Sequence, residues 1–221
     1  MLTFEELLDE IKFGETTILF YPGLSYIREF IILKILNHAK IRNIPVIIDD
    51  NLDALSIVSR NLKILGFAED FQDAYVVKTG GRQNIGKIIT RVRLHPDPRV
   101  YIQEYSENIQ RSLKEHRIER FINIVLGIED LFRYLNSPHE VYLLVLAIQR
   151  FLGDKRRKAF YIVNENSLKV LPPQVYLELM RVATTIIRAV PNFITANLTI
   201  IKSLNPGLIG KEISLELEVE R

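Results

Sequence analysis

The sequence contains no cysteine and no tryptophan, and it has only 2 methionines among its 221 residues. The absence of cysteine excludes disulfides, thiolate metal sites and cysteine nucleophiles, and it fits a reducing cytoplasm. Because isoleucine is abundant at the same time, the composition favours a thermophilic source.

Excess charge of one sign is also missing, since the formal net charge is only +2. A balance so close to zero gives no argument for a nucleic-acid partner. No apolar run approaches the roughly 18 residues of a membrane-spanning helix, and the acidic, amphipathic segment 1–6 is unlike a signal peptide. We therefore expect a cytoplasmic protein with no membrane partner.

What the chain does contain is material for a core, with 48% hydrophobic and 25% charged residues. Short apolar runs, typical of strands buried on both faces, alternate with helical patterns up to residue 182. This alternation predicts parallel strands joined by right-handed crossovers. The runs expected at the centre of the sheet lie at 17–21, 45–49, 121–126 and 159–163.

The end of the chain shows a different pattern. Segments 184–190, 196–203 and 212–219 are joined by short loops and predict a meander of antiparallel strands. We expect the first two to join the central sheet as antiparallel neighbours. No linker divides the chain, so we expect one domain over residues 1–221.

A further pair of strands is expected around a glycine pair. Residues 74–78 read as a strand, and the alternation from Ile85 to Leu94 predicts a second strand paired with it. Gly80 and Gly81 between them predict a hairpin turn.

Residues 17–43 predict a strand, a tight turn and a long helix, and a phosphate-binding loop would lie at that corner. Such a loop has the pattern G-x-x-x-x-G-K-[S/T]. Gly23 is present, but Tyr26 and Ile27 stand where the lysine and the hydroxyl residue are needed. Without the lysine, the corner lacks a charge-assisted contact worth roughly 1.5–3 kcal/mol.

Two interpretations of this corner remain open. The backbone amides of Gly23, Leu24 and Ser25 still bind an anion at the helix start, where the helix dipole favours negative charge. Alternatively, the corner is an ordinary turn from strand to helix.

Asp49, Asp50 and Asp53 cluster after a buried strand, at the sheet edge where ligands of α/β proteins bind. Close carboxylates can orient a water molecule or hold a hard cation such as magnesium. In the other interpretation, Asp50 or Asn51 caps the following helix and Asp53 complements its dipole.

Two further charged groups have competing interpretations. Glu129 and Asp130 follow the central strand and favour the first turn of a helix. The basic run Lys155, Arg156, Arg157 and Lys158 forms either a patch that neutralises nucleic-acid phosphates or a solvated loop.

The order of these segments resembles the RecA-like ATPase core in its KaiC-like branch, and most closely an uncharacterised archaeal family of KaiC-like domains with degenerate nucleotide-binding motifs. The resemblance covers most of the chain. It is carried by Tyr21-Pro22-Gly23 and by residues 46–53 and 124–129. It implies a P-loop NTPase-type α/β fold, with a mainly parallel sheet flanked by helices and antiparallel C-terminal strands. Asp49 or Asp50 falls where active relatives carry a catalytic carboxylate.

These features predict a non-catalytic RecA-like domain that acts as a cytoplasmic interaction or regulatory module. Self-association is expected, because RecA-like ATPases assemble with the nucleotide site between subunits, and no cofactor is expected. The alternatives are a weak nucleotide- or nucleic-acid-binding protein and a divalent-metal-dependent ATPase remnant that uses Asp49, Asp50 and Asp53. An apolar patch on an outer face would favour the module, and a basic groove beside the aspartates would favour the alternatives.

Overall fold

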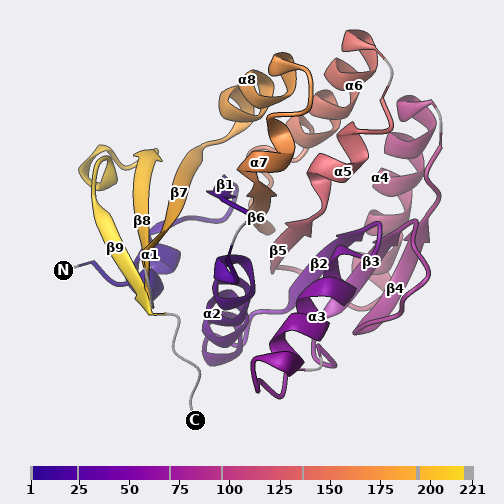
Figure 1. Ribbon diagram of the computed structural model, residues 1–221. Coiled ribbons are helices and arrows are strands. Elements are labelled where there is room, and N and C mark those ends of the chain that lie inside the picture. Colours follow the sequence, from indigo (N-terminus) through magenta and orange to yellow (C-terminus); the bar gives the residue numbers. More distant parts are fainter. Residues whose placement is uncertain are drawn as a thin grey trace.

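The computed structural model describes residues 2–23, 25–69, 71–95, 97–135, 137–192 and 195–216. Helices and strands alternate along most of this part of the chain (Figure 1). The strands are β1 (Thr16–Tyr21), β2 (Val46–Asn51), β3 (Tyr75–Thr79), β4 (Lys87–Val92), β5 (Phe121–Leu126), β6 (Arg157–Asn164), β7 (Thr185–Asn192), β8 (Thr195–Lys202) and β9 (Glu212–Glu216). The helices are α1 (Phe4–Glu10), α2 (Ile27–Ile41), α3 (Ala54–Ile64), α4 (Pro98–Glu115), α5 (Ile128–Phe132), α6 (Pro138–Gln149), α7 (Glu165–Leu168), α8 (Pro173–Val182) and the short 3-10 helix η1 (Pro206–Leu208).

All of these strands form one 9-stranded sheet in the order β4-β3-β2-β5-β6-β1-β7-β8-β9. The four strands expected at the centre, β2, β5, β6 and β1, are adjacent and parallel, which confirms that prediction. Every residue of β1, β2 and β5 is buried, because helices cover both faces of a parallel sheet.

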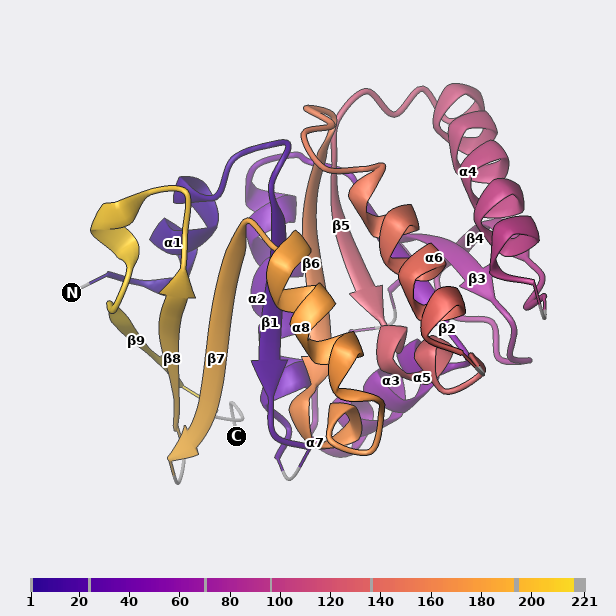
Figure 2. The ribbon, with the colours of Figure 1, turned by 90° about the horizontal axis from the view of Figure 1, so that it is seen from above.

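The sheet lies between two helical layers, which are seen from above in Figure 2. Helices α1, α2 and α3 pack on one face, and α4 to α8 pack on the other. Successive residues of a strand point to opposite faces, so in β1 Leu19 joins the first core and Ile18 and Phe20 join the second. Among the described residues, no helix combines the length and apolar composition needed to cross a bilayer.

The strand β7 differs from the expectation for residues 184–190. It runs parallel to β1, with Thr185 opposite Thr17, because α8 carries the chain back across the sheet before β7 begins. The antiparallel pairing starts one strand later, between β7 and β8 and between β8 and β9. The antiparallel C-terminal strands are therefore present, but the first of the three segments belongs to the parallel part of the sheet.

The prediction of a hairpin turn at Gly80 and Gly81 is wrong. Strands β3 and β4 are parallel, with Tyr75 opposite Lys87. The connection 80–86 runs back along the sheet edge without a helix, which is short for a parallel connection. Both glycines adopt positive φ angles, 62° and 69°, which lets this short segment turn back.

Candidate functional site

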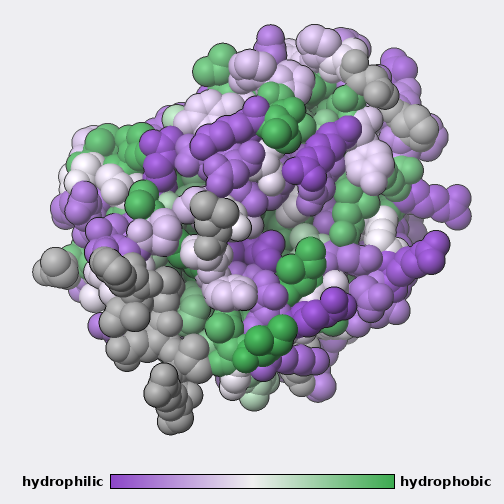
Figure 3. Space-filling view, viewed as in Figure 1, coloured by the Kyte–Doolittle hydropathy of each residue, from purple (hydrophilic) through white to green (hydrophobic). Residues whose placement is uncertain are grey.

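The carboxyl ends of the parallel strands meet at one edge of the sheet, which faces the viewer in Figure 1. In the rotated view, the arrows of β1, β5 and β6 point toward this edge (Figure 2). Around its middle the same face is mainly hydrophilic, and hydrophobic side chains gather over α3 (Figure 3). Since ligands of open α/β sheets bind at such an edge, the residues that follow these strands form the candidate site.

The turn after β1 is the corner that the sequence predicts as a ligand site. Gly23 packs closely against Asn164, the last residue of β6, and a Cβ atom on Gly23 would lie only 2.4 Å from Asn164 Nδ2. Glycine is therefore needed there for the close approach. The Oγ atom of Ser25 is buried and has no hydrogen-bond partner in the described part of the chain. Leu24 lies outside the described residues.

A pocket of 440 Å³ opens at this corner. It is lined by Tyr21, Gly23, Ser25, Tyr26, Arg28, Glu29, Ile57, Asn61 and Asn164. Two large side chains of this lining, Tyr26 and Ile57, are half exposed, at 50% and 52%. The pocket therefore has an apolar rim over a polar interior.

Opposite charges lie together in the pocket wall. Arg28 Nη2 donates to Glu29 Oε1 at 2.7 Å, and Asn61 Nδ2 donates to the same oxygen at 2.8 Å. The Arg28 guanidinium also lies 5.9 Å from the centre of the Tyr21 ring. The positive charge of Arg28 is thus already compensated by a neighbour whose side chain is only 2% exposed.

A second carboxylate, Glu129 of α5, lies behind the pocket wall. Its Oε1 accepts a hydrogen bond from the backbone N–H of Asn164 at 3.2 Å, and its Oε2 is buried without a partner among the described residues. Burial raises the pKa of Glu129 to about 7, although backbone hydrogen bonds and the charge of Arg28 act against this rise. Two carboxylates therefore share the surroundings of one guanidinium.

Asp50 and Asp53 are joined by a lysine of the same chain. Lys78 of β3 is 1% exposed, and its Nζ contacts Asp50 Oδ2 at 2.5 Å and also pairs with Asp53 Oδ1. Asp50 Oδ1 accepts from the backbone N–H of Leu55 at 2.9 Å, so Asp50 caps α3, as one interpretation predicted. Partial burial acts to raise the pKa of Asp53, but hydrogen bonds from Lys78 and from two backbone amides of the connection 80–86 outweigh it and lower that pKa.

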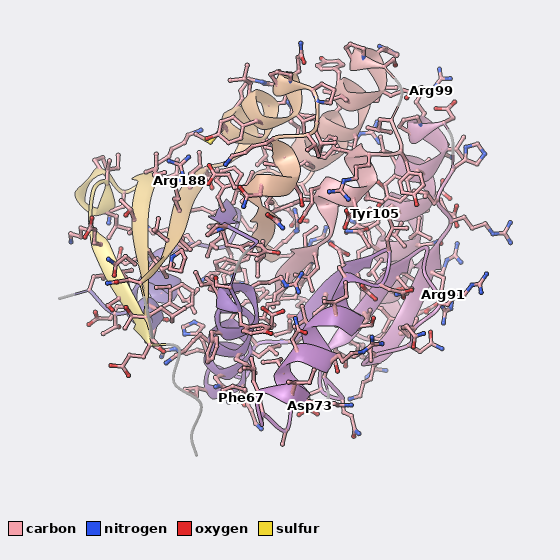
Figure 4. The ribbon with its side chains drawn as sticks, in the orientation of Figure 1. Phe67, Asp73, Arg91, Arg99, Tyr105 and Arg188 are labelled. Atoms are coloured by element: carbon pink, nitrogen blue, oxygen red, sulfur yellow. The ribbon has the colours of Figure 1, made fainter. Side chains whose placement is uncertain are left out.

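Asp49 points to the opposite face of the sheet. Both of its carboxylate oxygens accept from the Tyr105 hydroxyl at 3.0 Å, and Oδ2 accepts from Asn123 Nδ2 at 3.0 Å. Tyr105 reaches inward from α4 (Figure 4). Burial raises the pKa of Asp49, while the nearby charge of Arg157 and these hydrogen bonds act in the opposite direction. Asp49 belongs to a buried polar network and not to the pocket.

The three aspartates therefore do not share one site. The structure also separates them from the corner at Gly23, because β5 and β6 lie between β1 and β2. Within the described ranges, no group of three or more histidine, aspartate or glutamate side chains is arranged to hold a metal ion. The cation that lies between Asp50 and Asp53 is the ammonium group of Lys78.

The basic run is divided between the surface and the interior. Lys155 and Arg156 are exposed, whereas Arg157 and Lys158 begin β6 and are each only 4% exposed. Strand alternation sends these two side chains to opposite faces, where Arg157 Nε bonds Asn123 at 2.7 Å and Lys158 Nζ bonds a backbone carbonyl of α1 at 2.7 Å. The run does not form the continuous basic patch considered above, and it is not a fully solvated loop either.

Several residues that shape the site carry only weak sequence signals. Arg28 and Glu29 are a charged pair in the mainly apolar first half of α2, which is a hint of a buried ion pair. Lys78 is a lone cation near the end of the apolar strand β3, close in the fold to the acids it neutralises. Asn164 has no such signal, because its place beside Gly23 depends on the order of the strands.

The architecture and the pocket define an α/β protein with a mostly parallel sheet, helices on both faces and a polar site at the carboxyl edge. The chain belongs to the family described as "Pyrococcus protein of unknown function, DUF257", whose model matches residues 6–214. An uncharacterised archaeal family was expected, and this part of the expectation is confirmed. No curated protein matches the chain.

Two solved structures from Pyrococcus horikoshii are similar to this chain. The first, from a structural study of Project ID PH0250 of strain OT3, is 27% identical, with a TM-score of 0.81 over 96% of this chain and 98% of that chain. The second is an uncharacterized protein, PH0321, in complex with an unknown peptide. It is 15% identical, with a TM-score of 0.62 over 92% of each chain, and this likeness shows the fold alone.

Proposed function

We propose that this protein is a non-catalytic, RecA-like interaction module that binds a segment of peptide chain in the pocket at the carboxyl ends of β1 and β6. The observation that carries the proposal is the charge arrangement of the pocket. A polar cavity of 440 Å³ lies where a phosphate loop would be, yet its cation is paired with the buried carboxylate of Glu29.

The RecA-like assignment is supported by the position of the Pro22-Gly23 turn. It follows a central parallel strand, leads into α2 and lies at the same sheet edge as the end of β2, which carries Asp49 and Asp50. This arrangement agrees with the resemblance in the sequence.

The lack of catalysis is supported by the environment of the corner. Phosphoryl transfer needs a positioned metal and compensated phosphate charge. A nucleotide phosphate at this corner would meet the carboxylate of Glu29, and a close pair of like charges costs about 1 kcal/mol in water and more where solvent is excluded. Asp49 is engaged with Tyr105 and Asn123 on the other face of the sheet, and that removes the carboxylate expected to position water.

Peptide binding is supported by the rim of the pocket and its surroundings. Tyr26 and Ile57 offer exposed apolar surface, and Ile64, two turns further along α3, is 76% exposed. Exposed apolar surface beside polar groups is typical of protein interaction sites. The similar protein PH0321 was solved with an unknown peptide, which makes a peptide a reasonable first class of ligand to test.

Nucleotide binding is the alternative that a specific observation favours. The N-terminus of α2 opens toward the corner, and Tyr26 at its N-cap position supplies no side-chain hydrogen bond to the first amides. Free amides at a helix start favour anions. The carboxylate of Glu29 acts against this, so we expect weak nucleotide affinity at most.

Calorimetric titration separates these ligands. A pool of random pentapeptides should bind to the wild-type protein, whereas ATP with magnesium should show neither measurable affinity nor phosphate release above background. Ile57→Ser should weaken peptide binding at least about threefold, because it removes apolar rim surface. The matched control Ile41→Ser changes an isoleucine that is 76% exposed and absent from the lining, so it should leave binding unchanged. Tight ATP binding without peptide binding would overturn the proposal.

We also propose that the protein is cytoplasmic and self-associates, and a separate measurement tests the self-association. Sedimentation velocity at several protein concentrations should show a dimer or a larger species. A single monomeric species throughout would remove self-association and leave the peptide-binding proposal standing.

A further inference from the structure

We propose that the ligand of this pocket presents a primary ammonium group, which is bound by the carboxylate of Glu29 with Glu129 adding negative charge behind it. The inference rests on the proposed function, because it names the chemical group by which a peptide would be recognised. The ammonium belongs either to the amino terminus of the peptide or to a lysine side chain.

The charges in and behind the pocket wall favour a cationic ligand. Arg28 and Glu29 are the charged residues of the lining, and they neutralise one another at 2.7 Å. Glu129 adds a second carboxylate that acts on Tyr21 and Arg28, two residues of the pocket wall. Arg28 and Glu29 cancel one another, and Glu129, whose pKa burial raises to about 7, is only partly ionised at neutral pH. A positive charge on the ligand would favour the ionised form of Glu129.

The carboxyl group of Glu129 has an oxygen atom without a hydrogen-bond partner among the described residues. Glu129 is 6% exposed, and its Oε2 has no partner in the described part of the chain. Buried polar atoms are nearly always hydrogen-bonded, and each exception calls for an explanation. Its Oε1 is held by the backbone N–H of Asn164, which is itself a lining residue. The Glu129 carboxyl group therefore lies directly behind one residue of the pocket wall.

The donor geometry of an ammonium group also suits the pocket. An ammonium group has three donors and no acceptor, which suits a lining that contains the carboxylate of Glu29 and Ser25, whose buried Oγ has no partner among the described residues. A divalent cation needs several converging oxygen ligands, and no group of three acidic or histidine side chains suited to a metal exists among the described residues. A phosphate or carboxylate would face the carboxylate of Glu29, so a compact monocation fits best.

Four peptide pools test the inference on the unmodified protein. Each pool consists of random pentapeptides with a fluorescent label at the carboxyl end, and binding is followed by fluorescence anisotropy. The first pool lacks lysine and has a free amino terminus. The second is the same pool after acetylation of the amino terminus. The third contains lysine and is acetylated only at the amino terminus, and the fourth is the third pool with its lysines acetylated as well.

We expect the first pool, the third pool or both to bind. Acetylation of the responsible amine should weaken binding at least about tenfold, as for a hydrogen-bonded charge. Binding of the first pool alone identifies the amino terminus as the source, and binding of the third alone identifies lysine. If the second and fourth pools bind as well as the others, the ammonium inference is overturned while peptide binding stands. If no pool binds, the proposed function fails as well.

Variants of Glu29 and Glu129 test the inference independently. Glu29→Gln keeps an acceptor for Arg28 and should weaken binding of the responsive pool at least about tenfold. Glu129→Gln, one layer further back, should weaken it about threefold. Asp130→Asn is the matched control, because Asp130 follows Glu129 in α5 but is partly exposed and pairs with Arg133 at 3.1 Å. Loss of binding in Asp130→Asn equal to that in Glu29→Gln would contradict the assignment.

Discussion

At the scale of single residues, the direction of each side chain decides which acids can act together. Asp49 and Asp50 are neighbours in β2, and strand alternation alone sends them to opposite faces. The alternation in the sequence therefore already indicates that they cannot share a ligand. The prediction of one site grouped them because they are close along the chain. Asp50, Asp53 and Glu129 could be recognised as candidates from the sequence, whereas their pairing with Lys78 or Asn164 could not, since each partner lies on a different element.

Removal of the lysine that neutralises Asp50 and Asp53 should destabilise the protein strongly. We expect Lys78→Met to lower the free energy of unfolding by about 3–5 kcal/mol, because it leaves the buried Asp50 without a counter-charge. Urea denaturation followed by circular dichroism measures the change. The control Lys155→Met alters an exposed lysine and should shift the unfolding free energy by no more than about 0.5 kcal/mol. Equal losses in the two variants would show that the buried ion pair contributes nothing.

Glu129 should make stability depend on pH in a definite direction. Its pKa in the folded protein is about 7, above its ordinary value of 4.5, so the folded state holds more protons between these two values. Stability from this group is therefore present below pH 4.5 and is lost as the pH rises to about 7.

Glu129→Gln should remove this dependence. The variant should match the wild type near pH 4.5 and exceed it above pH 7 by as much as about 3 kcal/mol. Tyr21, Arg28 and Asp130 also act on Glu129, so the comparison is the difference between the two proteins at each pH. A difference that stays constant from pH 4.5 to 8 would contradict the raised pKa of Glu129.

At the scale of elements, the glycine pair in the connection 80–86 predicts the turn correctly but predicts the wrong direction for the strand that follows it. The glycine pair does mark a turn, but the strands on either side are parallel. The difference comes from Asp53, which accepts hydrogen bonds from the backbone N–H groups of Arg82 and Gln83 at 2.8 and 2.9 Å. These contacts hold the start of the connection against the β2–α3 loop, and no pattern within residues 74–94 could reveal them.

Gly81 should be the least replaceable residue of this connection. A Cβ atom there would lie 2.4 Å from Asp53 Oδ1, and its φ angle is +69°. Gly153 has a similar φ angle of +78° but open space around it, so Gly153→Ala measures the backbone cost alone, about 1–2 kcal/mol. Gly81→Ala should cost at least about 1 kcal/mol more, because Asp53 must move. Equal unfolding free energies for the two variants would show that Asp53 does not hold this connection.

At the scale of the whole molecule, the sequence predicts the elements and the central sheet well, and its site less well. Apolar runs identified β1, β2, β5 and β6 correctly, because burial on both faces leaves a continuous signal. The parallel direction of β7 was missed, since it depends on α8 crossing the sheet and not on the residues of β7. The pocket at Gly23 was missed in part for the same reason, because the order of the strands brings Asn164 beside it.

The central claim is that the pocket at the carboxyl ends of β1 and β6 binds a peptide segment and not a nucleotide. Amide NMR spectra of the isotope-labelled protein, recorded during titration with the pentapeptide pool and separately with ATP and magnesium, test it most directly. The account predicts that the peptide pool shifts the amide signals of Gly23, Ser25, Glu29 and Asn164, and that ATP leaves them in place. Shifts of these signals by ATP alone, or peptide-induced shifts confined to other parts of the molecule, would contradict it.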